Sequence, residues 1–316
     1  MAVWLVTGVT GFLGRHVREA LGRGAPDVYA LGRRRPPDCP EHRFIAADLN
    51  DVAGLERAVR RIKPDFVIHT AGRIPPAPAE DLYRANFWCT THLLGALRRL
   101  GKPMRIVLAG SAAELGPVPA ADLPVSEEYD GYPFDAYGRS KRLATFTGLG
   151  ERPPLEVIVA RIFTPIGPYL PTTQALGRFA ERLAELGADP VVLDVGDLDT
   201  RRDFIDVRDV AQAMLAMAIK GRAGRVYHIA TGRSRRVSEG LEFLIGLSGR
   251  LVQTRVDPTL LDWRGPSDSI AKIDRIGAET GWEPRITWEQ SLTDLWHAVR
   301  DAQASRSCPA PVPASA

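Results

Sequence analysis

Three glycines follow the first apolar run of the chain at intervals of three residues. Gly8, Gly11 and Gly14 come directly after Val3–Val6, in the segment VTGVTGFLG. Glycine there lets the backbone turn tightly after a strand and approach a pyrophosphate, and it lets the next helix pack on the sheet with its N-terminus facing the anion. The spacing is G-x-x-G-x-x-G rather than the commoner G-x-G-x-x-G. A turn in another kind of α/β protein can carry the same glycines, so this segment alone leaves both interpretations open.

Short apolar runs alternate with longer stretches of helical periodicity from Met1 to about Ile162. This alternation is typical of a parallel sheet wrapped by helices, so we predict an α/β, doubly wound fold of the Rossmann type. The pattern becomes irregular after Thr164, where we expect a helix near Leu176–Leu186 and a strand at Val191–Val195. The strands expected before that point are Val3–Thr7, Val28–Leu31, Arg43–Ala46, Phe66–Thr70, Arg105–Ala109 and Glu156–Arg161.

Two side chains capable of acid–base chemistry are four residues apart in the segment YGRSK. On a helix, Tyr137 and Lys141 lie one turn apart on one face, so the ammonium can lie beneath the phenol and favour its ionised form. A free phenol titrates near about 10, and a nearby cation would make it usable as an acid or base at neutral pH. An exposed helix can also carry this pair by chance.

Ser111 follows the expected strand Arg105–Ala109. It therefore lies at the carboxyl edge of the sheet, where open α/β folds bind ligands and where a hydroxyl can hold a substrate oxygen. Serine is also an ordinary residue at the end of a strand.

Composition excludes several classes of function. Lys and Arg number 41 and Asp and Glu 38, and the net charge of +3 is too small to indicate nucleic acid or a membrane surface as a partner. The cysteines Cys39, Cys89 and Cys308 and the six histidines lack metal-ligand spacing, so we expect no metal site. With no apolar run near about 18 residues and no leader-like start, we expect a cytoplasmic protein.

The order of these segments resembles the extended short-chain dehydrogenase/reductase superfamily, a group of NAD(P)-dependent nucleotide-sugar epimerases, dehydratases and reductases. The glycine loop, Ser111 and the YGRSK segment carry the resemblance, which extends nearly from end to end. Other matching segments are Asp48–Leu49, His69–Gly72, Asn86, Ala160–Pro168, Arg202–Val210 and Gly281–Pro284. The last two segments, together with Gly265–Asp268, most resemble the GDP-4-keto-6-deoxymannose reductases.

This resemblance implies two domains. A dinucleotide-binding domain would comprise 1–163 and 204–224, and a smaller α/β nucleotide-sugar domain would comprise 164–203 and 225–301. Residues 302–316 are rich in Ala, Ser and Pro, which predicts a disordered tail.

It also implies a homodimer. The helices near Leu82–Leu100 and Asp135–Leu149 would form a bundle across the interface.

The residue after the second strand bears on the choice of cofactor. An acid there would bond the adenosine ribose of NAD, whereas arginine can pair with the 2′-phosphate of NADP. The chain has Arg33, so we predict NADP, with NAD possible; a solvated basic loop is the other interpretation. By resemblance, Asp48 contacts adenine, although it can instead cap the following turn. The full set implied for the cofactor is Gly8, Gly11, Phe12, Leu13, Gly14, Arg33, Asp48, Leu49, Ala71, Gly72, Asn86, Tyr137 and Lys141.

The catalytic residues implied by the resemblance are Ser111, Tyr137 and Lys141. Tyr137 would protonate a carbonyl oxygen held by Ser111 while the nicotinamide delivers hydride, and Lys141 would bind the nicotinamide ribose. The nucleotide-sugar contacts implied are Ser111, Thr164, Arg202 and Arg264, the two arginines holding the diphosphate. Arg202 can instead pair with Asp203 or Asp199 at the surface.

Dehydratase relatives carry a glutamate two residues after the catalytic Ser or Thr. This chain has Ala113 there, which disfavours elimination. Glu114 is adjacent, but in an extended segment its side chain would point the other way.

Three functions are compatible with these observations. The first is NADPH-dependent reduction of a nucleoside-diphosphate 4-keto-6-deoxy sugar, with a GDP-sugar favoured. The second is an NAD(P)-dependent nucleotide-sugar epimerase, which uses the same three residues but returns the hydride to the substrate. The third is a non-catalytic NADP-binding regulator. The presence of Ser111, Tyr137 and Lys141 together argues against it, because a protein that only binds NADP does not need residues that transfer a proton.

Overall fold

Two compact units make up the chain. The computed structural model describes residues 2–22, 27–185, 190–261 and 268–307. Unit 1 comprises Met1–Pro165, Arg201–Ser234 and Gly265–Arg285, and unit 2 comprises Ile166–Thr200, Arg235–Arg264 and Ile286–Ala316.

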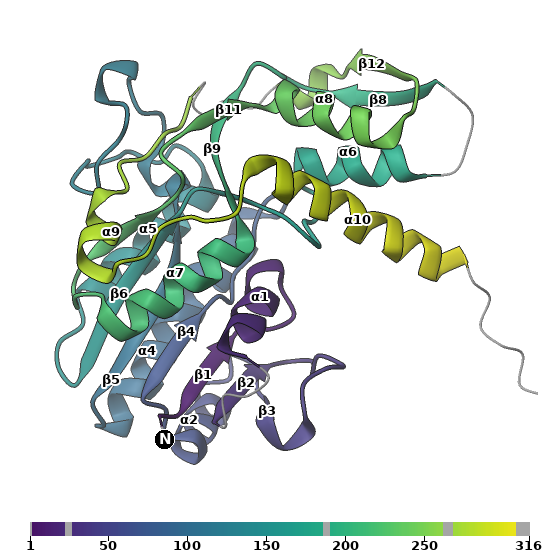
Figure 1. Ribbon diagram of the computed structural model, residues 1–316. Helices are drawn as coiled ribbons and strands as arrows, with labels where there is room; N and C mark the ends of the chain where they lie inside the picture. The colour runs from purple at the N-terminus through teal and green to yellow at the C-terminus, as the bar shows by residue number, and fades with distance from the viewer. Residues whose placement is uncertain (1, 23–26, 186–189, 262–267, 308–316) are drawn as a thin grey trace, which may run out of the picture. The chain divides into compact units, whose positions relative to one another are not determined.

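Unit 1 contains a seven-stranded sheet whose paired strands are all parallel, in the order β10-β6-β5-β4-β1-β2-β3 (Figure 1). Its strands are β1 (Trp4–Thr7), β2 (Val28–Gly32), β3 (Phe44–Ala46), β4 (Phe66–His69), β5 (Met104–Ser111), β6 (Leu155–Ile162) and β10 (Val226–Ile229). The order of strands reverses between β1 and β4. Open α/β sheets bind ligands at the carboxyl ends of the strands beside such a point.

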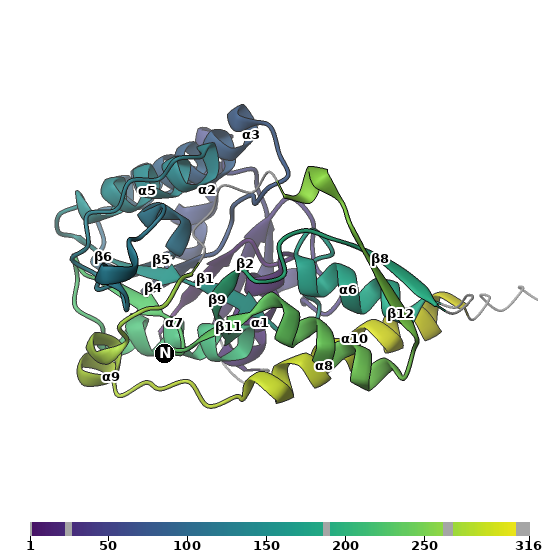
Figure 2. The same ribbon diagram turned by 90° about the horizontal axis from the view of Figure 1, so that it is seen from above.

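Helices cover both faces of this sheet. Figure 2 shows α2, α3 and α5 on one side of the strands and α1 and α7 on the other. Side chains alternate along each strand: Val6 and Ile68 pack among residues of α1 and α7, whereas Leu5 and Val67 pack among residues of α2 and α4. The helices of unit 1 are α1 (Phe12–Leu21), α2 (Val52–Ile62), α3 (Ala79–Tyr83), α4 (Cys89–Leu100), α5 (Ala136–Leu149), α7 (Val207–Lys220) and α9 (Asp274–Thr280). Short 3-10 turns at Glu41–Arg43, Ala112–Leu115 and Ala120–Asp122 and a π-helical turn at Arg84–Trp88 accompany them.

The doubly wound α/β fold expected from the sequence is confirmed. Each of the six strands expected before Thr164 is present, with ends that differ by one or two residues. The strand expected at Val191–Val195 has those bounds, and the helix expected near Leu176–Leu186 is α6 (Ala175–Ala184).

Two smaller sheets complete the strand pairing. A three-stranded sheet has the order β11-β9-β7, from β7 (Thr164–Ile166), β9 (Arg201–Asp206) and β11 (Ser234–Arg236). In unit 2, β8 (Val191–Val195) pairs in parallel with β12 (Val252–Val256). The helices of unit 2 are α6, α8 (Val237–Ser248) and α10 (Trp288–Ser307), with a 3-10 turn at Pro258–Leu260.

The division of the chain differs from the expected one. Residues 164–165, 201–203, 225–234 and 268–285 were expected in the nucleotide-sugar domain, but they fall in unit 1. The physical reason is strand pairing, since β10 adds to the sheet beside β6, with Val226 opposite Val159. Ile276 of α9 then packs in the core under that end of the sheet.

The expected tail also needs correction. Residues 302–307 are the last turns of α10 rather than a disordered segment, because alanine favours helix and Gln303 bonds to the Glu181 carbonyl at 3.3 Å. Residues 308–316 lie outside the described residues.

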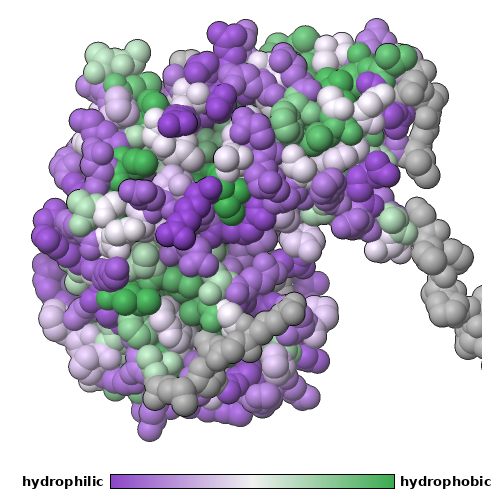
Figure 3. Space-filling view, in the orientation of Figure 1, coloured by the Kyte–Doolittle hydropathy of each residue, from purple (hydrophilic) through white to green (hydrophobic). Residues whose placement is uncertain are grey.

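Most of the face drawn in Figure 3 is hydrophilic, with smaller apolar patches. Among the described helices, none is long and apolar enough to cross a membrane.

Candidate active site

The glycine loop is tightly packed against the loop that follows β4. Gly8 has a φ of +73°, and a Cβ on it would lie 2.5 Å from the Ala71 nitrogen. A Cβ on Gly14 would lie 2.2 Å from the Gly8 carbonyl oxygen. Both positions therefore require glycine, as the sequence predicted. Gly11 is the N-cap residue of α1 and has no side chain to cover the first amide groups of that helix, which suits the approach of a pyrophosphate.

The loop after β4 also approaches α5. A Cβ on Gly72 would lie 2.7 Å from Asn86 Oδ1 and 3.6 Å from Lys141 Nζ. Asn86 is buried, accepts a bond from the Arg73 nitrogen at 2.8 Å and donates to Ser140 Oγ at 2.9 Å. Its amide thus fixes the position of Gly72 relative to α5. Gly8, Gly14 and Gly72 thus let the glycine loop, the loop after β4 and α5 pack closely together. They lie at the carboxyl ends of β1 and β4, where the strand order reverses and where a sheet of this kind binds a dinucleotide.

Tyr137 and Ser111 are brought together at the end of β5. Asp135 caps α5 by accepting a bond from the Gly138 nitrogen at 2.6 Å, so Tyr137 lies in the first turn of that helix. The Ser111 side chain lies close enough to the phenol to affect its ionisation. The pKa of Tyr137 is raised to about 12, mainly by burial and also by the charges of Glu114 and Asp135, whereas the neighbouring Ser111 side chain lowers it.

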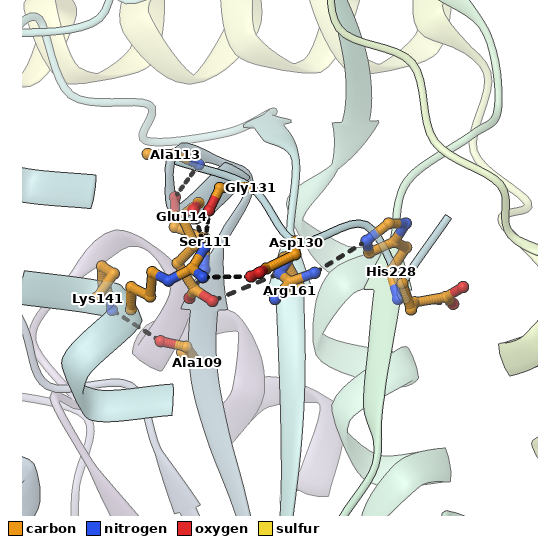
Figure 4. A network of polar contacts seen from close by, with 11 residues as sticks. Ala109, Ser111, Ala113, Glu114, Asp130, Gly131, Lys141, Arg161 and His228 are labelled. Carbon is orange, nitrogen blue, oxygen red and sulfur yellow. Dashed lines mark hydrogen bonds and ion pairs between the residues drawn. The ribbon is translucent and has the colours of Figure 1, made fainter. Parts of the chain in front are cut away.

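Lys141 follows Tyr137 by one turn of α5, as predicted. Its ammonium donates to the Ala109 carbonyl at 2.7 Å, as Figure 4 shows, and burial lowers its pKa to about 8. The sequence predicts that this ammonium favours ionisation of the phenol. In the structure burial outweighs any such effect, because the pKa of Tyr137 is raised.

Glu114 is the residue for which the sequence-based expectation is wrong. The segment after Ser111 is not extended but forms the 3-10 turn Ala112–Leu115, so Glu114 points back toward Ser111. Its Oε1 accepts a bond from the Ser111 nitrogen at 2.8 Å, and its Oε2 lies 3.4 Å from Arg161 Nε on β6 (Figure 4). The S-x-x-E spacing of a capping box was the signal for this geometry. The Arg in an apolar strand was a second signal, since a buried Arg needs an acidic partner.

The loops after β2 and β3 lie close together. Charges of both Asp48 and Arg33 act on Cys89, whose pKa burial raises to about 11. Asp48 Oδ1 accepts bonds from the backbone and side chain of Asn50 at 2.9 and 3.1 Å, so it holds the local turn, as the second interpretation of this residue required. Arg33 is exposed.

The residues expected to bind the nucleotide sugar are only partly described. Thr164 begins β7 and is half-buried. Arg202 of β9 donates to the Arg201 carbonyl at 2.6 Å. The next residue, Asp203, is buried and accepts bonds from the Thr231 and Gly232 nitrogens, which fixes this strand, and burial raises its pKa. Arg264 lies outside the described residues. Among the described side chains, no group of three or more His, Cys, Asp or Glu is placed to hold a metal ion.

Comparison with known proteins identifies the family. Residues 4–230 match the profile of the NAD dependent epimerase/dehydratase family. This match covers the glycine loop, Ser111 and the segment from Tyr137 to Lys141.

Individual relatives extend the match to more than nine tenths of the chain. The chain is 32% identical to GDP-6-deoxy-D-mannose reductase of Pseudomonas aeruginosa over 91% of its length and 93% of the relative. It is 30% identical to dTDP-6-deoxy-L-talose 4-dehydrogenase (NAD(P)(+)) of Kitasatospora kifunensis, over 94% and 95%. Among solved structures, RMD from Pseudomonas aeruginosa complexed with NADPH superimposes with a TM-score of 0.82 at 29% identity, covering 96% of this chain and 100% of that one.

Proposed function

The chain belongs to the NAD dependent epimerase/dehydratase family, and we propose that it reduces the keto group of a nucleoside-diphosphate 4-keto-6-deoxy sugar with NADPH. One observation carries the proposal: Ser111 and Lys141 lie with Tyr137 at the carboxyl edge of β5, in the same sheet whose first strand leads into the glycine loop. The two relatives named above act on nucleotide-bound 6-deoxy sugars. A GDP-sugar is favoured because the more similar of the two is a GDP-sugar enzyme.

The proposed chemistry assigns one proton to the chain. NADPH supplies a hydride when it is bound. Tyr137 donates its phenolic proton to the carbonyl oxygen, and the Ser111 hydroxyl donates a hydrogen bond to the same oxygen. With its pKa raised to about 12, Tyr137 remains protonated at neutral pH and so is present in the form a reduction consumes. Lys141 would bind the nicotinamide ribose through its ammonium, which lies close to Gly72 of the loop after β4.

The substrate contacts belong to the same proposal. Arg202 and Arg264 would hold the diphosphate, since guanidinium groups pair with phosphate oxygens in a bidentate manner. Thr164 would contact the sugar through its hydroxyl.

Elimination of water is disfavoured by the residues after Ser111. Position 113 is alanine, and the nearby carboxylate of Glu114 is held by the Ser111 nitrogen and Arg161. A carboxylate engaged in this way is poorly placed to remove a proton from a sugar.

The second candidate is a nucleotide-sugar epimerase, which the family description supports. The test is a panel of nucleotide-bound ketosugars, with GDP, dTDP and UDP as the nucleotide, each incubated with NADPH or NADH. The proposal expects net NADPH oxidation with a 4-keto-6-deoxy sugar, fastest with the GDP compound. If a sugar nucleotide is converted and no coenzyme is consumed, the enzyme is an epimerase.

Cofactor selectivity is proposed to depend on Arg33. Replacing Arg33 with alanine should raise the Kd for NADPH by roughly 10-fold to 100-fold, because a charge-assisted bond to the 2′-phosphate contributes about 1.5–3 kcal/mol. The Kd for NADH should stay within about twofold, since NADH lacks that phosphate. Fluorescence titration measures both constants.

Arg34→Ala is the matched control, because the neighbouring Arg34 is also exposed. If Arg33→Ala raised the Kd for NADPH and the Kd for NADH by the same factor, the proposed contact with the 2′-phosphate would be contradicted.

A homodimer through α4 and α5 is also proposed. Trp88, at the end of the π-helical turn, is 50% exposed, and Phe146 of α5 is 55% exposed. Large aromatic side chains exposed on adjoining helices are typical of a surface that a partner covers.

Phe146→Glu should therefore convert the dimer to a monomer, because a carboxylate would replace an apolar ring at the interface and burying it is costly. Sedimentation equilibrium measures the mass. The control is Ile219→Glu, at an equally exposed position on α7. A wild-type protein that sediments as a monomer, or a Phe146→Glu variant that remains dimeric, would refute the interface.

A further inference from the structure

Glu114 is nearly fully buried, with 1% of its surface exposed, yet it carries an acidic side chain. Its Oε1 accepts the Ser111 amide at 2.8 Å, and Gly110 leaves the space for it, since a Cβ there would lie 2.7 Å from that oxygen. Ser111 Oγ in turn accepts a bond from the Ala113 nitrogen at 3.2 Å. With one lone pair of Oγ engaged in this way, the hydroxyl hydrogen is left for another acceptor. Glu114 and its turn thus fix the direction in which Ser111 can donate.

The second oxygen of Glu114 faces a buried cation. Arg161 is 8% exposed, its Nε lies 3.4 Å from Glu114 Oε2, and its other edge lies 3.5 Å from His228 Nε2 (Figure 4). Burial and the charge of Arg161 lower the pKa of His228 to about 3, so the histidine is neutral and adds no charge. The negative charge of Glu114 and the positive charge of Arg161 therefore offset each other without a contribution from His228.

A buried ion pair is costly to desolvate, and apolar residues of similar volume often give equal or greater stability. A contribution to fold stability is therefore a weak explanation for the Glu114–Arg161 ion pair. Its position in the candidate active site explains it better, because the charge of Glu114 acts on both Tyr137 and Lys141.

The other charged or titratable groups of this network come from several elements. Asp135, Lys141 and Arg142 belong to α5, and the Arg142 guanidinium lies 3.4 Å from the Glu114 carbonyl oxygen. Arg161 belongs to β6 and the neutral His228 to β10. From β4 comes His69, which burial keeps neutral by lowering its pKa to about 3. Of these, Glu114 is the acid that also bonds to the backbone of Ser111.

We propose that the Glu114–Arg161 pair is a positioning device that orients Ser111 and keeps the charge beside Tyr137 balanced, so that the phenol retains its proton until it is transferred to substrate. This inference rests on the proposed function for its catalytic meaning. It makes Glu114 a positioning residue and not the base of an elimination.

Charge and hydrogen bonding can be separated by three variants. Glu114→Gln keeps the oxygen that accepts the Ser111 amide, but it removes a charge that raises the pKa of Tyr137 and leaves Arg161 unbalanced, so the alkaline limb of the kcat/KM profile should move down by about one pH unit. In the double variant Glu114→Gln/Arg161→Gln both charges are removed, and the limb should return close to its wild-type position. Glu114→Ala/Arg161→Gln has the same net charge as Glu114→Gln/Arg161→Gln but lacks the oxygen that accepts the Ser111 amide. Its kcat should be about tenfold lower than that of Glu114→Gln/Arg161→Gln, with an unchanged Kd for NADPH.

A second readout requires no sugar substrate. The tyrosinate absorption of Tyr137 is measured at one fixed alkaline pH, with each variant's Tyr137→Phe form subtracted. Glu114→Gln should show more tyrosinate than the wild type, and Glu114→Gln/Arg161→Gln should match the wild type. If no ketosugar is reduced by the wild-type protein, the proposed function fails, while the order of tyrosinate fractions still decides this inference.

The matched control is Glu156→Gln. Glu156 pairs with Arg105 at 2.8 Å across the same two strands, β5 and β6, at their opposite end. Its pH profile should equal that of the wild type. The proposal is overturned if Glu114→Gln leaves both the alkaline limb and the tyrosinate fraction unmoved, or if removal of Arg161 in the double variant fails to restore them. Should Glu114→Gln fail to fold, the comparison of the two double variants still decides whether the acceptor orients Ser111.

Discussion

Replacement of Tyr137 by phenylalanine should lower kcat by roughly 100-fold to 10,000-fold, the usual contribution of a positioned general acid. The phenol that Ser111 contacts is the proposed source of the proton, and a benzene ring cannot supply one. NADPH affinity should change by less than about threefold, since the ring remains in place. Stopped-flow measurement of NADPH oxidation and fluorescence titration separate the two effects.

The pH dependence of the same reaction has a definite sign. Because burial raises the pKa of Tyr137 to about 12, the protonated acid persists through neutral pH, and ionisation of the phenol removes the proton donor under strongly alkaline conditions. Tyr132→Phe is the matched control, because Tyr132 is 82% exposed, five residues earlier in the chain. A Tyr137→Phe variant with wild-type kcat would show that the proton comes from another group.

Gly14→Ala is the second substitution with a large expected effect. A Cβ at this position would lie 2.2 Å from the Gly8 carbonyl oxygen and 2.8 Å from Thr70 Oγ1, so the first turn of α1 must move away from Gly8 and from the loop after β4. Overpacking of this kind costs about 1–3 kcal/mol. If this cost falls on the conformation that binds NADPH, the Kd for NADPH rises by roughly 10-fold to 100-fold. Calorimetric titration measures the affinity, and thermal unfolding measures the loss of stability.

A second helical glycine provides the control. Gly246 of α8 has no atom within 4 Å of the position a Cβ would take, so Gly246→Ala should leave NADPH affinity unchanged and stabilise the helix by up to about 1 kcal/mol. Equal NADPH affinity in Gly14→Ala and Gly246→Ala would show that the cofactor does not use the glycine loop.

Residues close together in sequence were predicted well. The glycine loop follows β1, and the spacing of Tyr137 and Lys141 places both in α5, because each pattern depends on one turn or one helix. The central sheet followed from its apolar runs for the same reason.

Features that depend on distant segments were predicted poorly. β10 joins the sheet after the chain has passed through unit 2, and nothing in its four residues indicates which strand it pairs with. Glu114 points opposite to the predicted direction because Ala112–Leu115 form a 3-10 turn and not an extended segment. Its partner Arg161 is 47 residues away, and only the fold brings the two together.

Transfer of a labelled hydride tests the central claim most directly. The enzyme is incubated with a nucleoside-diphosphate 4-keto-6-deoxy sugar and NADPH that carries deuterium at the transferred position, and the sugar product is analysed by mass spectrometry and NMR. We predict one deuterium at C4 of the sugar for each NADPH oxidised. Sugar converted without deuterium, and without net oxidation of NADPH, would contradict reduction and indicate that the hydride returns to the substrate it came from.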